Sequence, residues 1–249
     1  MIMTTKTRLI YSPNFDAKKR KQKDVRFLIF HYTGIKKEKN AIKKLTKIQS
    51  QVSTHYLIKI NGEIIEMVPD LYVAWHAGVS NWGKCSSLNK YSIGIEISNP
   101  GHQFGYVNFS KKQIKNLIKL SNSLINKYKI KKNCVLGHSD VSPDRKLDPG
   151  EKFPWKFLSK NRIGIWHNLN EKKLKSLRNK IILVKENILF MKNLRKFGYH
   201  SKSIRIKRNS KYNKLLIKAF QRRFRPELIN SKIDQECLLI ANKLANIKL

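Results

Sequence analysis

Residues 135–150, "VLGHSDVSPDRKLDPG", bring several chemically capable side chains into one short stretch. An apolar run ends at a histidine, and a loop rich in charge follows; together they carry His138, Asp140, Asp144, Lys146 and Asp148. Imidazole and carboxylate groups are the usual ligands of catalytic zinc. The stretch is therefore either a surface turn of solvated charges or one side of a metal site, and the pattern alone leaves both interpretations open.

A second histidine occupies a similar position at the end of an apolar run. "VRFLIFHYTG" (residues 25–34) is typical of a buried strand ending at His31, and "NCVLGH" predicts another ending at His138. Strand ends hold side chains rigidly at the rim of a cleft. Catalytic zinc takes three protein ligands, and these two histidines with one loop carboxylate satisfy that number. Asp148 is the preferred carboxylate because a Pro-Gly pair follows it and fixes its backbone; the alternative is two hydrogen-bonded rim histidines.

Two further residues have types that suit a hydrolytic site. "YSIGIEIS" (residues 91–98) alternates strictly, so its isoleucines point to one face of a strand and Glu96 to the other. Glu96 is either an ordinary exposed residue or lines a cleft, where it would act as a general base beside a metal. Lys146 would bring the fixed positive charge that a developing oxyanion requires. The alternative for Lys146 is one more solvated lysine.

The surrounding segments predict the scaffold that positions these residues. Residues 55–68 form two apolar runs around Asn-Gly, the strongest short hairpin signal. Residues 110–128 predict a helix that opens with a capping box. Residues 40–52 predict another helix, with one apolar face formed by Ile42, Leu45 and Ile48. Strands and helices alternate, which favours an α/β (α+β) fold with a mixed central β-sheet flanked by helices.

The character of the chain changes towards its C-terminus. From about residue 175 only helical patterns and turns remain. One predicted helix ends at Gly198, a second stops before Pro226, and a third has Asp234 as its N-cap. We therefore predict two domains, a catalytic domain over residues 1–170 and a small three-helix domain over residues 175–249.

Composition limits the functional classes. The chain has 249 residues and a formal net charge of +37. Such a charge favours a polyanionic partner, namely nucleic acid, anionic lipid or an acidic cell-wall polymer, or is only a compositional bias. No clear nucleic-acid-binding motif accompanies it. The three cysteines, at positions 85, 134 and 237, form no C-x-x-C pair, which argues against a disulfide framework and a thiolate zinc cage. No apolar stretch has the length of a transmembrane helix.

Taken together, the motifs resemble those of a known family. "FHYTG", "STHYLIKINGEIIEMV", "AWHAG", "SIGIEISNPG" and "GHSDVSPDRKLDPGEKFPW" occur in the order and spacing of the zinc-dependent N-acetylmuramoyl-L-alanine amidases, which are related to the peptidoglycan recognition proteins. The resemblance covers about residues 8–165. It implies one zinc ion per catalytic domain.

The resemblance also assigns roles by position. It implies zinc ligation by His31, His138 and Asp148, catalysis by Glu96, and transition-state support by Lys146. His76 in "WHAG" is similar to the cleft-lining histidine of the family, and Asn99 in "EISNPG" lies where substrate contacts are made. For His76, a packing role or support of a ligand is the alternative.

The implied function is hydrolysis of the amide bond between N-acetylmuramic acid and L-alanine in peptidoglycan or muropeptides. Residues 175–249 are similar to the three-helix peptidoglycan-binding module; the alternative is a helical cap that only stabilises the catalytic domain. A non-catalytic peptidoglycan-binding protein is the alternative function, and a nucleic-acid binder is a third, based on charge alone. The expected partner is peptidoglycan or a muropeptide, with no specific nucleic acid.

The cellular location stays open at this stage. An amidase domain followed by such a module resembles the envelope-associated amidases, which favours the bacterial periplasm. The N-terminal stretch "MIMTTKTRLIYSPNFDAKKR" shows neither a signal peptide nor a lipoprotein cysteine, so the cytoplasm is the alternative.

Overall fold

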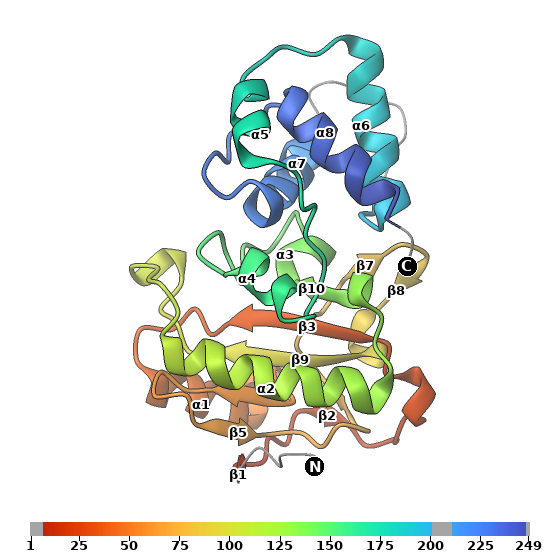
Figure 1. The fold of residues 1–249 in the computed structure, drawn as a ribbon. Helices are drawn as coiled ribbons and strands as arrows, with labels where there is room; N and C mark the ends of the chain where they lie inside the picture. The colour runs from red at the N-terminus through yellow and green to blue at the C-terminus, as the bar shows by residue number, and fades with distance from the viewer. Residues whose placement is uncertain (1–6, 201–210, 248–249) are drawn as a thin grey trace.

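The computed structural model describes residues 7–200 and 211–247. Its centre is a six-stranded sheet in which four neighbouring strands are parallel and one hairpin adds the antiparallel pair (Figure 1). The strand order is β1 (Thr7–Leu9), β5 (Ile64–Glu66), β4 (Tyr56–Ile58), β9 (Ser92–Ile97), β3 (Phe27–Tyr32) and β10 (Val135–Gly137). The predicted mixed sheet is therefore confirmed, as is the hairpin that joins β4 to β5.

Smaller elements surround the sheet. Two short antiparallel pairs are β2 (Phe15–Asp16) with β6 (Val73–Ala74), and β7 (Asn81–Trp82) with β8 (Cys85–Ser86). Short 3-10 turns lie at Gln22–Asp24, Ile48–Ser50, Leu88–Tyr91, His102–Phe104 and Lys132–Cys134. The helices of this part are α1 (Glu38–Thr46), α2 (Lys111–Tyr128), α3 (His138–Val141) and α4 (Trp155–Lys160).

Helices cover both faces of the sheet. The long helix α2 packs its apolar side on the isoleucines of β9, and the capping box between Ser110 and Gln113 opens it as predicted. Helix α1 lies against the opposite face, where Leu45 packs on β4 and β5. The prediction that Ile48 shares this apolar face is wrong. The helix ends at Thr46, so helical spacing no longer governs Ile48, which is 61% exposed in the following turn.

The C-terminal part is helical, as predicted. We call residues 171–200 and 211–247 the helical module; its helices are α5 (Glu171–Leu177), α6 (Val184–Phe197), α7 (Lys211–Phe224) and α8 (Gln235–Ala245). The stops before Gly198 and Pro226 and the N-cap at Asp234 are all present. Helix α5 falls across the predicted boundary at residue 175. The division into two domains stays a prediction.

The helical module packs directly on residues 7–170, which we call the sheet part. Figure 1 shows it beside β10 and the β7–β8 hairpin, with α3 and α4 between it and the sheet. Trp82 of the hairpin lies edge-on to Tyr199 of the module, with ring centroids 4.9 Å apart. One apolar cluster extends from Ile29 and Leu136 of the sheet to Phe220 of α7. The two parts therefore share a continuous buried core.

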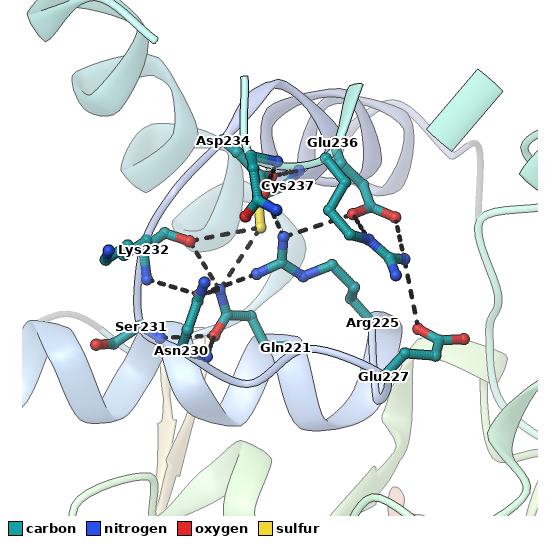
Figure 2. A network of polar contacts seen from close by, with 11 residues as sticks. Gln221, Arg225, Glu227, Asn230, Ser231, Lys232, Asp234, Glu236 and Cys237 are labelled. Carbon is teal, nitrogen blue, oxygen red and sulfur yellow. Dashed lines mark hydrogen bonds and ion pairs between the residues drawn. The ribbon is translucent and has the colours of Figure 1, made fainter. Parts of the chain in front are cut away.

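A buried polar network holds the module together (Figure 2). Arg225 follows α7 and points its guanidinium between Asp234 and Glu236 at the start of α8, with Nη1 2.5 Å from Asp234 Oδ2. Arg178, at the end of α5, binds both carboxylate oxygens of Glu236. Removing one partner of such a buried pair costs about 3–5 kcal/mol because the other charge stays uncompensated. No helix among the described residues is long and apolar enough to cross a bilayer.

Candidate active site

Strand register brings the candidate catalytic residues to one face of the sheet. His31 of β3 is paired with Glu96 of β9, and the two point to the face opposite α2 because the flanking isoleucines pack against that helix. Gly137 of β10 pairs with Phe30 of β3, so His138, the next residue, lies beside His31. The sequence pattern predicted this orientation of Glu96.

Three candidate ligand atoms converge at this edge of the sheet. His31 Nδ1 lies 2.9 Å from His138 Nδ1 and 3.0 Å from Asp148 Oδ2, and His138 Nδ1 lies 3.0 Å from the same carboxylate oxygen. All three side chains are buried. Within residues 7–200 and 211–247, this is the one group of histidine, cysteine or acidic side chains arranged so that it can hold a metal ion.

The hydrogen bonds behind the two histidines fix their tautomers. His138 Nε2 lies 3.1 Å from Ala77 O, which only accepts, so Nε2 carries the hydrogen and Nδ1 presents a lone pair. Ser92 Oγ donates to Leu88 O and therefore accepts from His76 Nε2, which leaves His76 Nδ1 as an acceptor. His31 Nε2 donates to that atom at 3.0 Å.

It follows that His31 Nδ1 also presents a lone pair. Two imidazole lone pairs and a carboxylate oxygen then face one another within about 3 Å, an arrangement that is repulsive without a cation between them. Second hydrogen bonds of this kind are the usual support of metal-ligating histidines. The donor set and its tautomers therefore fit a metal such as zinc, which takes imidazole and carboxylate ligands.

The electrostatics of the three groups agree with this arrangement. Burial, together with the nearby His138, lowers the pKa of His31 to about 4, so the ring is neutral at pH 7. Burial opposes ionisation of Asp148, yet the close approach of His138 and His31 holds the pKa of Asp148 far below its ordinary value. His31 and Asp148 thus present a neutral imidazole and a carboxylate, the protonation states in which such groups bind a metal.

Glu96 and Lys146 lie beside the three candidate ligands. Both line a cleft of about 330 Å³ that His138 and Asp148 also line. Glu96 Oε2 is buried without a hydrogen-bond partner among the described residues. Burial and the negative charge of Asp148 raise the pKa of Glu96 to about 8, partly offset by Lys146. A carboxylate with this pKa and a free oxygen is suited to accept and return protons near neutral pH.

His76 lies behind His31 and also borders the cleft. It leaves no room for a side chain on the neighbouring strand: a Cβ placed on Gly94 would lie 2.5 Å from the His76 ring. The hydrogen bond to His31 is the support role that the sequence left as an alternative. Contact of His76 with substrate stays a prediction.

Asn99 lies under a loop at the same end of the sheet. Its side chain is buried, with Nδ2 donating to Val107 O and Oδ1 accepting from Gly101 N. These bonds fix the loop that follows β9. Both polar atoms of the Asn99 amide thus have protein partners. Contact of Asn99 with substrate stays a prediction.

Other cleft residues were not singled out from the sequence. They include one lysine from α1, two aromatic residues and an arginine, namely Lys44, Tyr32, Trp75 and Arg145. Trp75 belongs to the "AWHAG" motif that also contains His76, and this position in the motif was the available signal that Trp75 lines the cleft. Lys44 belongs to a lysine-rich helix and has no such signal.

We expect the buried histidines to make the metal-free protein acid-sensitive. Burial lowers the pKa of His55 to about 3 and those of His31 and His167 to about 4, against about 6.5 in the unfolded chain. As pH falls below 6.5 the unfolded state takes up protons that the native state does not, so stability decreases. The free energy of unfolding, measured with urea, should drop by about 1–2 kcal/mol per buried histidine between pH 7 and pH 5. His167→Gln should reduce that drop, and a pH-independent stability would contradict the argument.

Comparison with known proteins places this chain in a family. The family model described as N-acetylmuramoyl-L-alanine amidase matches residues 21–151, more than half of the chain, and this range contains His31, Glu96, His138 and Asp148. The chain belongs to the N-acetylmuramoyl-L-alanine amidase family. It is an amidase that hydrolyses the bond between N-acetylmuramic acid and L-alanine.

Relatives of this amidase differ in how much of the chain they match. The amidase AmiD of Escherichia coli is 34% identical over 88% of this chain and 82% of its own length. The 1,6-anhydro-N-acetylmuramyl-L-alanine amidase AmpD of Haemophilus influenzae is 36% identical over 63% of this chain and 93% of its own. A solved structure of the Escherichia coli AmiD with anhydro-N-acetylmuramic acid-L-Ala-D-gamma-Glu-L-Lys has a TM-score of 0.77 and 33% identity, covering 92% of this chain and 90% of that one. The likeness to AmiD therefore includes the helical module of the amidase.

Proposed function

We propose that this amidase is a zinc enzyme whose metal is held by His31, His138 and Asp148. The observation that carries the proposal is the convergence of three lone-pair atoms within about 3 Å, with tautomers fixed by the hydrogen bonds behind them. When bound, zinc supplies Lewis-acid polarisation and makes water a nucleophile at neutral pH.

The protein's own residues carry the proton transfers. Glu96, at the cleft, accepts a proton from the attacking water and then returns it to the departing L-alanine amine. Lys146 projects from the loop that also carries Asp148, and its positive charge stabilises the oxyanion that forms on the scissile carbonyl. No covalent enzyme intermediate is required.

The substrate is a muropeptide, whether free or within the wall. The solved complex of the Escherichia coli AmiD with an anhydro-muropeptide supports this, because that protein matches the present chain over nearly its whole length. The deciding experiment incubates the zinc-loaded protein with a soluble anhydro-muropeptide and with intact sacculi. Mass spectrometry should identify free stem peptide beginning with L-alanine. Binding of either substrate without release of peptide would favour the non-catalytic alternative.

We expect Lys146→Met to change the pH profile as well as the rate. Glu96 must be ionised to act as a base, so kcat/KM falls on the acid side, and the charge of Lys146 lowers the pKa of Glu96. Removing that charge should move the acid limb to higher pH. Lys160→Met, at the end of α4 and outside the cleft-lining set, is the matched control. An unmoved limb in Lys146→Met would contradict the proximity of the two groups.

We further propose that the helical module contributes to wall binding. Its three longer helices resemble a peptidoglycan-binding module, and the chain's charge of +37 attracts the carboxylates of stem peptides. Binding to purified sacculi should weaken between about 0.1 M and about 1 M salt, where the Debye length falls from about 10 Å to about 3 Å. Co-sedimentation measures this, and salt-independent retention would contradict an electrostatic contribution.

A further inference from the structure

The carboxylate of Asp140 is enclosed between residues 7–170 and the helical module. Asp140 lies in α3, two residues after His138, and is 1% exposed. Its Oδ2 accepts a hydrogen bond of 2.8 Å from the backbone N–H of Gly137, the residue just before His138. Its Oδ1 accepts from Tyr199 Oη of the module at 2.6 Å. Asp140 therefore connects the module to the turn that presents His138.

Arg223 of α7 completes the enclosure. Its Nη1 lies 2.5 Å from Asp140 Oδ2, and its Nη2 donates to Val135 O at the start of β10. Its guanidinium lies 4.1 Å from the centre of the Trp155 ring. Arg223 is 2% exposed. The Arg223 side chain thus contacts the strand that leads to His138, the helix that begins at His138, and Trp155, whose ring lies beside Gly137.

The segment around His138 is also hydrogen-bonded to Asp148, the third candidate ligand. Ser139 N donates to Asp148 O at 2.8 Å, which ties the residue after His138 to Asp148. Gly137 lies so close to the next residue of that loop that an added Cβ would be 2.7 Å from Pro149. A shift of residues 137–140 therefore displaces both His138 and Asp148.

We propose that Arg223 and Tyr199 are positioning residues for the metal site and act through Asp140. This inference rests on the proposed metal site. Without Arg223 the buried carboxylate of Asp140 loses its only ion pair among the described residues, and an uncompensated buried charge draws the segment towards water. The helical module is then a structural component of the metal site in addition to any role at the wall. Supporting contacts of this kind change metal affinity by about 10- to 100-fold.

The experiment measures zinc affinity of the full-length chain by competition with a chelating dye. The variants are Arg223→Met and the milder Tyr199→Phe. Their matched controls are Arg225→Met, which removes an equally buried arginine from the network in Figure 2, and Tyr56→Phe, which removes another tyrosine hydroxyl 2.6 Å from a buried aspartate, Asp70. Melting temperatures of all metal-free proteins are measured in parallel.

We expect zinc affinity to fall by about 10- to 100-fold in Arg223→Met and by a smaller factor in Tyr199→Phe. The two controls should lower the melting temperature and keep wild-type affinity. Adding Asp140→Asn to Arg223→Met removes the unpaired charge and should restore part of the affinity. Two results overturn the inference. One is wild-type zinc affinity in both Tyr199→Phe and Arg223→Met, and the other is a loss of zinc affinity in the controls as large as the loss in those variants.

The wild-type protein separates this inference from the proposed function. If it binds one zinc ion and the variants bind as tightly, the inference fails and the proposed metal site stands. If the wild type binds no zinc, the proposed metal site fails and the inference fails with it.

Discussion

Glu96→Gln is expected to lower kcat/KM on a soluble muropeptide by about 10²- to 10⁴-fold, the usual contribution of a general base. Glutamine keeps the size of the side chain but cannot accept the proton of the attacking water. The strand context should tolerate the change, because Glu96 Oε2 has no hydrogen-bond partner among the described residues that would be lost. Zinc content should therefore equal that of the wild type. Steady-state kinetics with metal quantification on the same sample measures both quantities.

Glu66→Gln provides the control for this variant. Glu66 is a partly buried glutamate of β5, which β4 separates from β9 in the sheet, and it does not line the cleft. The Glu66→Gln variant should keep the wild-type kcat/KM. Activity of Glu96→Gln within a few-fold of wild type would show that another group is the base. A loss of zinc together with activity would instead point to a structural role for Glu96.

His31→Ala is expected to abolish both metal binding and turnover. The substitution removes one of the three proposed ligands and the donor to His76, so the rate should fall to the background level. Dialysis of the wild type against a strong chelator should produce the same loss. Added zinc should then restore the activity of the wild-type protein but not that of His31→Ala. Elemental analysis and peptide release measure the two effects.

His167→Ala is the control for His31→Ala. His167 is also a buried histidine with a lowered pKa, but it lies outside the group of candidate ligands. The control should keep one zinc ion per chain and measurable activity. Full activity of His31→Ala after chelator treatment would contradict a metal-dependent reaction.

Local sequence patterns were sufficient to predict the scaffold of the site. The alternation in residues 91–98 placed Glu96 opposite the isoleucines because side chains of a strand alternate between faces. The apolar runs before His31 and His138 predicted two strands, and their adjacency in the parallel sheet brings the histidines together. Asp148 was preferred among the loop carboxylates because Pro149 and Gly150 follow it, and the resemblance to the family implied the same residue.

Contacts between distant segments could not be predicted in this way. Arg223 stands in "QRRFRP", where helical spacing and the basic composition both favour solvated arginines. Its burial against Asp140, 83 residues earlier, follows only from docking of the module onto the sheet. The hydrogen bond between His31 and His76 is similar: each residue belongs to a recognisable motif, but no local pattern specifies their contact.

Diffraction from crystals of the zinc-loaded protein, measured at the zinc absorption edge, shows directly whether His31, His138 and Asp148 hold the metal. We expect one anomalous peak per chain, enclosed by His31 Nδ1, His138 Nδ1 and the carboxylate of Asp148. An anomalous peak elsewhere on the chain, or none at these three side chains, would contradict it.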